Sequence, residues 1–254
     1  MCTLALYFRT FEAYPLIVAA NRDEHYDRPS AAPALLNTRP QIIAGRDLRA
    51  NGTWLGVNNH GLIAGILNRR SDSEQQGSSK KRSRGLLCMD VLKSASGRAA
   101  KEFLQDHRVS YNPFTLLFAD RQEAYICYND EQRIITQKLK KGLHVLSSAA
   151  EFEMHSAKAD RAYARFANLS TRVQPINGTA VESIAALQAV LADHSPGEDS
   201  TNAGDAICVH RESSGTVSSS VIYFSEVESL FHTFFCPGPP CRDSFSEALT
   251  LNVR

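Results

Sequence analysis

The chain has 254 residues and a nearly neutral charge, with 28 lysine and arginine residues against 27 acidic ones. This balance excludes a dedicated nucleic-acid binder, which would carry a basic excess. Hydrophobic residues make up 43% of the chain, so there is enough apolar material for a sizeable core. The longest apolar run, residues 15–20, is far shorter than the ~20 residues that span a bilayer.

Cysteine usage and the first residues indicate the compartment. Six cysteines in a chain of this length are too sparse for a disulfide scaffold. The start has no basic region typical of a signal peptide, and Arg9 interrupts its apolar stretch. We therefore expect a soluble protein of the reducing cytoplasm.

Apolar and β-branched runs open the chain and predict two hairpins, the second turned through Asn59, His60 and Gly61. The predicted early strands are residues 2–9, 15–22, 41–44, 53–58 and 61–68. Residues 69–84 are rich in Ser, Gln, Lys and Arg, and we expect them to form an exposed basic loop.

Helical spacing then alternates with further strand patterns. Helices are predicted at residues 86–92, 99–104, 159–167 and 180–192. Thr179 and Glu182 stand at capping-box spacing before the last helix. The later strands are predicted at residues 114–119, 124–128, 133–138, 144–147, 206–210, 217–224 and 230–235.

The order of elements favours an α+β fold. The first strand is apolar on both faces, so both faces must be covered. Two stacked sheets with helices outside, a four-layer αββα sandwich, satisfy this requirement, and a three-layer α+β domain is the alternative. No internal repeat or linker is evident, so we expect one domain over residues 1–254.

Cys2 is a candidate nucleophile. Its side chain is small enough for methionine aminopeptidase to remove Met1, which would leave a thiol beside a free α-amine, with pKa values of ~8.5 and ~8. Because the amine can take the thiol proton, no histidine base and no catalytic cofactor is required. The alternative is that Cys2 simply begins a core strand.

Four polar residues, Asn21-Arg22-Asp23-Glu24, directly follow the apolar run of the second strand. Alternation puts the first and third of them on one face of the strand and the second and fourth on the other. The predicted hairpin brings the end of the second strand beside Cys2, so these residues are candidate catalytic partners. The alternative is a strand end that turns in solvent.

Asn68 closes the fifth predicted strand. An uncharged amide at a strand end can donate a hydrogen bond to an oxyanion without changing its protonation state. A strand-end asparagine that only begins a turn is the alternative.

Several ordered motifs in the first 70 residues point to a known family. They are Met1-Cys2-Thr3, Ala19 to Glu24 with Arg28-Pro29, Gly52 to Val57, and Gly61-Leu62. Together they resemble the NRDE family, the family of the transport and Golgi organisation protein 2. This resemblance implies intracellular trafficking, linked to heme handling and lipid homeostasis.

That family is similar in turn to the N-terminal nucleophile hydrolases, especially bile-salt hydrolase and penicillin V acylase. The similarity implies the αββα fold and gives Asn68 the place of the oxyanion asparagine. It also shows departures. An arginine and an aspartate of the acylases map by position to Asn21 and Glu24, and an asparagine maps to Ser148.

Two functions therefore stand at this point. The first is a carrier that binds heme or an acyl lipid near Cys2 and residues 21–24 and hands it on. The alternative is a cysteine amidohydrolase acting on a non-peptide C–N bond. As weak axial ligands for heme, which would be cargo, the sequence offers His25, His60 and Cys236.

Partners can be expected from the same features. We expect a small-molecule ligand and heme-accepting proteins, and the basic loop suits an anionic membrane surface. No metal site is expected at His232, Cys236 and Cys241, because no Cys-x-x-Cys pair is present.

Overall fold

The computed structural model describes residues 2–69, 81–106, 111–129, 134–148, 156–169, 180–196 and 202–254. The expected pairing of Thr179 with Glu182 and most of the predicted basic loop lie outside this part of the chain. The chain divides into two compact units. The first consists of residues 1–27, 141–228 and 232–250, and the second of residues 28–140, 229–231 and 251–254. The expectation of one domain stays a prediction.

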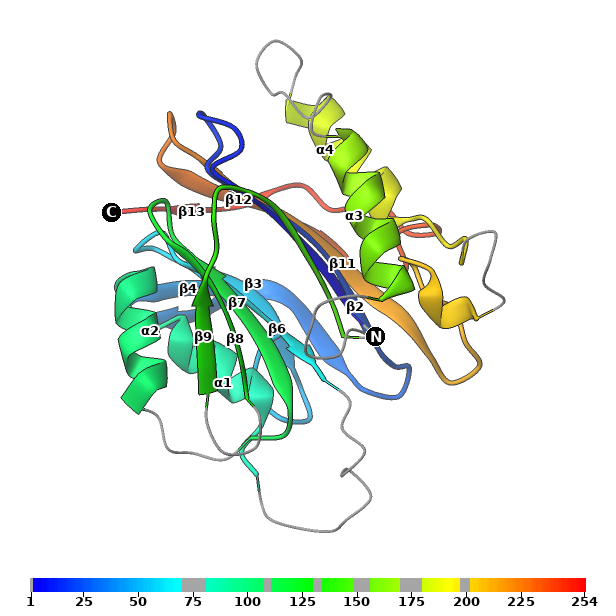
Figure 1. Ribbon diagram of the computed structural model, residues 1–254, viewed down its shortest axis with the longest axis horizontal. Coiled ribbons are helices and arrows are strands. Elements are labelled where there is room, and N and C mark those ends of the chain that lie inside the picture. Colours follow the sequence, from blue (N-terminus) through cyan, green and yellow to red (C-terminus); the bar gives the residue numbers. More distant parts are fainter. Residues whose placement is uncertain are drawn as a thin grey trace. The chain divides into compact units, whose positions relative to one another are not determined.

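The first sheet has six strands, shown with their helices in Figure 1. In spatial order they are β10 (Gly142–Ser147), β1 (Thr3–Phe8), β2 (Leu16–His25), β11 (Ser214–Ser225), β12 (Leu230–Cys236) and β13 (Leu249–Asn252). β1 and β2 form the predicted hairpin, with Thr3 opposite Asn21. β11 runs along the other edge of β2 with a register shift between Thr216 and Ser218.

Two helices, α3 (Ala157–Leu169) and α4 (Ala180–Leu191), pack on this sheet. Ala5 and Tyr7 of β1 belong to the same apolar cluster as Phe166 of α3 and Leu187 of α4. The Tyr7 hydroxyl also donates a 2.6 Å hydrogen bond to the Phe166 carbonyl. Residues on both faces of β1 are buried, as the apolar run predicts.

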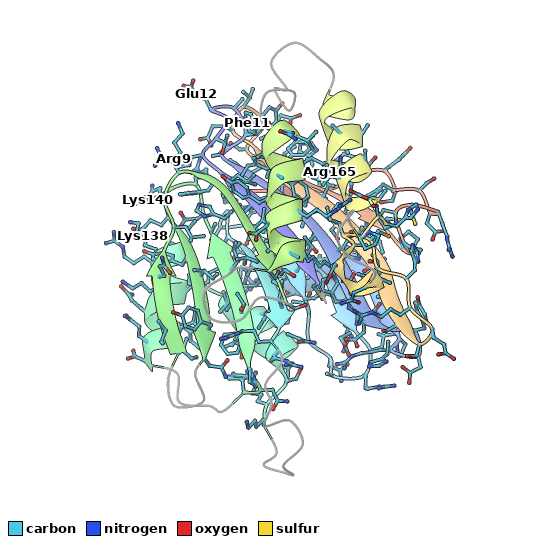
Figure 2. The ribbon with its side chains drawn as sticks, turned by 45° about the vertical axis from the view of Figure 1, so that its right-hand side comes forward. Arg9, Phe11, Glu12, Lys138, Lys140 and Arg165 are labelled. Atoms are coloured by element: carbon cyan, nitrogen blue, oxygen red, sulfur yellow. The ribbon has the colours of Figure 1, made fainter. Side chains whose placement is uncertain are left out.

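The turn between β1 and β2 separates its apolar and charged side chains (Figure 2). Phe11 is buried, and its ring lies 5.9 Å from that of Tyr7. Arg9 and Glu12 are exposed. The Arg9 amide donates to the Pro15 carbonyl at 2.6 Å and closes the turn.

The second sheet is a meander of seven strands in sequence order. They are β3 (Ser30–Thr38), β4 (Gln41–Asp47), β5 (Leu55–Asn58), β6 (Ile63–Asn68), β7 (Phe114–Ala119), β8 (Ala124–Asn129) and β9 (Ile134–Lys138). Helix α1 (Arg84–Val91) packs on β6 and β7, and α2 (Gly97–Asp106) on β7, β8 and β9. None of the helices in the described ranges is long and apolar enough to cross a membrane.

The turn between β5 and β6 is organised by Asn58. Its side-chain amide donates to the carbonyls of Leu92 and Ser94, at the end of α1, at 2.7 and 2.8 Å. Its carbonyl oxygen accepts from the amides of His60 and Leu62. Gly61 adopts φ of +87°, which favours glycine. This part of the family motif therefore closes a turn and fastens α1 to it.

The described ends of the predicted basic loop are held by the protein. Arg69 lies over the Tyr128 ring at 5.6 Å, and Arg82 pairs with Asp90 at 2.6 Å. Arg84 is the first residue of α1 and donates to a backbone carbonyl. Because α1 begins at Arg84, the predicted loop ends before this residue. The expectation that the loop is exposed stays a prediction.

Three further expectations need correction. β3 was not predicted, because its small residues and Pro33 are unusual in a strand; an edge strand tolerates them. β13 was also missed. Residues 206–210 were expected to form a strand, but only His210 makes an isolated bridge. The apolar residues of this segment are buried, which gives it the composition of a core strand. Its backbone hydrogen bonds are mostly made outside β-strand pairing. For example, the Cys208 amide donates to the Asp193 carbonyl.

Candidate active site

Cys2 lies against the backbone of Asp23. The Asp23 amide donates to Cys2 Sγ at 3.4 Å, and Sγ lies 3.6 Å from the Asp23 carbonyl oxygen. This contact follows from the β1–β2 hairpin, which puts the start of one strand beside the end of the other. On the other side, the Ser148 amide donates to the Cys2 carbonyl at 3.1 Å.

The environment of Cys2 favours the protonated thiol. Burial raises the pKa of the Cys2 thiol, and the Asp23 carboxylate acts in the same direction. The Asp23 amide and the Lys158 ammonium oppose this shift and hold the thiol pKa lower than burial alone would. Cys2 therefore needs a base before it can act as a nucleophile near neutral pH.

The Asp23 carboxylate forms a buried ion pair with Lys158. Lys158 Nζ lies 3.0 Å from Asp23 Oδ2, and the two side chains are 0% and 2% exposed. The other carboxylate oxygen accepts a 2.6 Å hydrogen bond from the Thr216 hydroxyl. Asp23 thus links β2 to α3 and β11 by charge-assisted contacts, close enough to Cys2 to affect the pKa of its thiol.

Lys158 was not among the predicted site residues. It lies on the apolar stripe of α3, with Ala159, Ala162 and Phe166 as the other buried residues. A charge in such a stripe must have a partner, because an unpaired buried ion costs several kcal/mol. The sequence therefore contained a signal for Lys158, a lysine in register with a helix's apolar face, but nothing that identified its partner.

Both hydrogen-bond donors of the Asn21 side chain are used in structural contacts. Its side-chain amide donates to the carbonyls of Leu191, at the end of α4, and Ile207, both at 2.9 Å. Its carbonyl oxygen accepts from the Ser219 hydroxyl at 2.6 Å. Both amide hydrogens are therefore used in holding helix α4 and the 206–210 segment to β2.

Arg22 and Glu24 alternate with these residues along β2. Arg22 is buried, and Glu24 is half-exposed with its carboxylate accepting from the His25 amide. The hydrogen bonds of Asn21 and Asp23 reach α4 and α3, so these two side chains lie on the helix-covered face of β2, as alternation predicts. A catalytic role for any of the four stays a prediction.

The other predicted site residues are dispersed. Asn68 ends β6 and His60 lies in the β5–β6 turn, both exposed in the second unit. His25 is exposed at the end of β2 in the first unit. Cys236 is buried at the end of β12, where its thiol donates to the Gly238 carbonyl at 3.3 Å. The oxyanion and heme-ligand roles of these residues stay predictions.

Buried hydroxyl groups occur close to Cys2 in the chain and in the sheet. Thr3 follows Cys2, Ser148 bonds its carbonyl through the backbone, and Ser218 stands opposite Arg22 in the strand pairing. Within the described ranges, the side-chain oxygens of Thr3, Ser148 and Ser218 have no hydrogen-bond partner.

A second cluster of chemically active side chains was not expected. Cys208, His210 and Cys241 converge, with both sulfurs 3.7 Å apart and His210 Nε2 3.7 and 3.1 Å from them. Burial, and then Cys241, raise the pKa of Cys208 to about 12. Burial, with Arg242 and His194, lowers the pKa of His210.

This cluster differs from the trio considered in the sequence. His232 bonds Glu228 at 2.9 Å and stacks on Tyr223, so it belongs to a different set of contacts. Sequence spacing failed here because Cys241 lies more than 30 positions beyond its partners. Only the fold brings the loop after β12 to the 206–210 segment.

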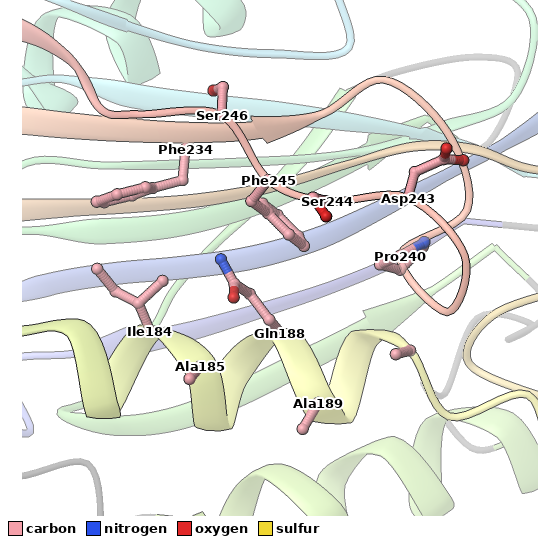
Figure 3. Close-up of a pocket in the computed structure, with 11 residues that line it drawn as sticks. Ile184, Ala185, Gln188, Ala189, Phe234, Pro240, Asp243, Ser244, Phe245 and Ser246 are labelled. Atoms are coloured by element: carbon pink, nitrogen blue, oxygen red, sulfur yellow. The ribbon is translucent and has the colours of Figure 1, made fainter.

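The first unit also contains a cavity of about 560 Å³ between α4 and the segment after β12 (Figure 3). Phe234 and Phe245 lie on one side and Ile184 and Gln188 of α4 on the other. Its volume is in the range of small-molecule sites. The remaining lining residues are Ala185, Ala189, Ala192, Pro240, Asp243, Ser244 and Ser246.

Two solved structures are similar to this chain in fold. Penicillin V acylase from Agrobacterium tumefaciens matches with a TM-score of 0.62 at 14% identity, over 97% of this chain and 86% of its own. A conjugated bile acid hydrolase variant from Clostridium perfringens gives 0.60 at 12% identity, over 99% and 97%. The predicted α+β fold of the N-terminal nucleophile hydrolase type is confirmed.

The sequence comparison then identifies the family. The profile of the Transport and Golgi organisation 2 family matches residues 1–233, and the chain belongs to this family. The human homologue of that name is 34% identical over 125 residues, which are 46% of this chain and 44% of the human protein. The mouse homologue is 32% identical over the same shares. The matched segment thus spans less than half of these relatives.

Proposed function

We propose that the protein cleaves the C–N bond of a non-peptide acyl amide, with Cys2 as the nucleophile after removal of Met1. The observation that carries this proposal is the position of the Cys2 thiol, 3.4 Å from the Asp23 amide and next to the buried Asp23–Lys158 pair. The fold supports it as well, because the similar structures include an acylase and a bile acid hydrolase.

The reaction requires only the chain's own groups. The free α-amine of Cys2 takes the thiol proton, and the thiolate attacks the acyl carbon. The C–N bond breaks as the amine product leaves with that proton, which leaves an acyl thioester on Cys2. Water then attacks the thioester, releasing the acid and restoring the thiol. The raised pKa of the Cys2 thiol is consistent with this need for an adjacent base.

Asp23 and Lys158 have defined parts in this scheme. The Asp23 carboxylate accepts hydrogen bonds from the Thr216 hydroxyl and the Lys158 ammonium, so it is held in one orientation. The Lys158 ammonium lowers the thiol pKa and favours the thiolate during attack.

Intact-mass spectrometry of protein purified from cells is the first test. The expected mass is that of the chain without Met1. The protein is then incubated with penicillin V and with a conjugated bile acid, the substrate types named for the two similar structures. Hydrolysis of one of them, with a transient acyl mass on the Cys2 peptide, would support the proposal.

The matched variants are Cys2→Ala and Cys127→Ala. Cys2→Ala should abolish turnover and acyl trapping, whereas Cys127, buried in β8, should tolerate alanine without loss of activity. Uniform retention of Met1, or turnover unchanged in Cys2→Ala, would rule this mechanism out.

A carrier is the second candidate function, in which the protein binds heme or an acyl lipid and passes it to an accepting protein. One observation favours it: both carboxylate oxygens of Asp23 are already bonded within the protein, to Lys158 and Thr216. A carboxylate used in this way is less available to hold an α-amine. The cavity beside α4 would receive the apolar part of the ligand.

Ligand titration separates the two candidates. A saturable Soret shift with hemin, retained in Cys2→Ala and lost in His25→Ala, His60→Ala or Cys236→Ala, would support the heme carrier and identify its axial ligand. Displacement of a fluorescent fatty acid by acyl lipids would support the lipid version. If neither ligand saturates the protein at micromolar concentration, the carrier candidate fails.

A further inference from the structure

The Cys208, His210 and Cys241 cluster shares no residue with the nucleophile site and has the composition of a metal site. Two thiols and one imidazole are ligands that zinc prefers, and three protein ligands leave a fourth position for water or another group. Cys208 is buried, whereas His210 and Cys241 are partly exposed. An ion can therefore reach the cluster from solvent while its ligands are held by the fold.

The distances fit one tetrahedral ion. Zinc bonds of ~2.3 Å to sulfur and ~2.0–2.1 Å to nitrogen place two sulfurs ~3.8 Å apart and a sulfur and a nitrogen ~3.5 Å apart. Here the two sulfurs are 3.7 Å apart, and the sulfur–nitrogen distances are 3.7 and 3.1 Å. The sulfur–sulfur distance matches the zinc geometry within ~0.1 Å, and the two sulfur–nitrogen distances need shifts of a few tenths of an ångström.

The same geometry argues against heme iron as the bound species. Protein ligands reach heme iron along the axis, one on each face of the ring. Three ligand atoms on one side, all within 3.7 Å of one another, cannot share that iron. A free ion of a thiophilic divalent metal can accept all three at once.

The cluster joins two segments that are otherwise distant in the chain. Cys208 and His210 belong to the irregular segment before β11, and Cys241 to the loop after β12 that lines the cavity. Between the two ligands of the first segment, the Val209 amide donates to the Thr216 hydroxyl, which donates to Asp23. An ion bound here would hold both the cavity wall and the segment that supports Asp23.

We propose that Cys208, His210 and Cys241 together bind one zinc-class divalent ion. Both thiols lose their protons to solvent on binding, and the imidazole binds in its neutral form through Nε2. The bound ion carries two thiolates, so its site is neutral overall. Its role is to fix the loop after β12 against the 206–210 segment.

The test uses the full chain, reduced and stripped of metal by a chelator, with its six thiols confirmed free by titration. Zn²⁺ is titrated against a chromophoric competitor, and Co²⁺ serves as a spectroscopic probe. We expect one ion per chain, and for Co²⁺ the thiolate charge-transfer and tetrahedral bands of a two-sulfur site. A wild-type protein that binds less than a tenth of an equivalent, or a Co²⁺ spectrum without thiolate bands, would overturn the proposal.

Variants assign the ligands. Cys208→Ser, Cys241→Ser and His210→Asn should each weaken binding more than roughly 100-fold, beyond the 10–100-fold loss expected for a residue that only supports a ligand. Cys236→Ser is the matched control, because this thiol ends β12, directly before the loop that carries Cys241, and donates to the Gly238 carbonyl. Unchanged affinity in the first three variants, or loss of the ion in Cys236→Ser alone, would contradict the assignment.

Discussion

Two buried asparagines, one in each unit, have the same structural role, and only one of them lies beside candidate catalytic residues. Asn21 lies within β2 and Asn58 ends β5, and each donates both side-chain amide hydrogens to two backbone carbonyls. In each case one carbonyl belongs to the end of a helix that packs on the same sheet, Leu191 of α4 or Leu92 after α1. Each asparagine therefore satisfies groups that a helix C-terminus leaves unpaired.

The two sites differ in the residues that come after the asparagine. After Asn58 the chain turns through Gly61, and the asparagine oxygen accepts backbone amides of that turn. After Asn21 the strand continues to Asp23, whose carboxylate is buried with Lys158 and whose backbone amide donates to the Cys2 thiol. A polar motif in this fold can therefore serve only to hold a helix end against a sheet. Whether such a site can be reactive depends on the residues next to the asparagine.

The largest expected effect is on the buried ion pair, which only the first site has. Lys158→Met should lower the free energy of unfolding by about 3–5 kcal/mol, because it leaves the Asp23 carboxylate buried without its cation. Chemical denaturation measures this loss. Lys138→Met, which removes the exposed pair with Glu123, is the control and should cost less than about 1 kcal/mol. An equal loss in the two variants would mean that the Asp23–Lys158 pair is no more important than a surface contact.

Because the two asparagines have the same structural role, we expect their alanine variants to lose similar amounts of stability. Asn21→Ala and Asn58→Ala should each lower the free energy of unfolding by about 2–4 kcal/mol, since two buried carbonyls lose their donor. Only Asn21→Ala should also change the rate at which iodoacetamide modifies Cys2. The exposed Asn112 is the control, and its alanine variant should stay within about 0.5 kcal/mol. If Asn58→Ala altered Cys2 modification, the distinction between the two sites would fail.

The turn beside Asn58 should respond to backbone strain alone. Gly61→Ala should cost about 1–2 kcal/mol, because φ of +87° is unfavourable for a residue with a Cβ atom. Gly61→Asn is the matched comparison and should cost less, since asparagine tolerates positive φ better. Thermal unfolding of the two variants measures the difference, and an equal loss would indicate crowding against Val253 as the cause.

The smallest expected effect is a shift in the pH dependence of Cys2. Burial raises the pKa of the thiol, so the reactive thiolate should form only above the ordinary value of ~8.5 and disappear as pH falls. Alkylation rates measured by peptide mass mapping across a range of about pH 7 to 10.5, with free cysteine as reference, give the midpoint. Lys158→Met should move that midpoint further up, because the ammonium lowers the thiol pKa. A midpoint below that of free cysteine would contradict the buried environment.

Much of the fold was predictable because local patterns carry it. The β1–β2 hairpin, the β5–β6 turn and all four helices follow from apolar periodicity and turn residues. The exceptions have physical reasons. β3 is an edge strand whose small residues and Pro33 disguise it, and the apolar segment 206–210 is buried without strand pairing.

The candidate site divides in the same way. The sequence alone determined that Cys2 and the polar run at residues 21–24 would be neighbours, because a short hairpin leaves no other arrangement. It could not assign their tasks: that Asn21 holds α4, that Asp23 pairs with Lys158, and that Cys241 meets Cys208 were decided by tertiary structure. The partners in these contacts lie 33 to 170 positions apart, and local periodicity contains no information over such distances. These contacts form only when the helices and the loop after β12 pack on the first sheet.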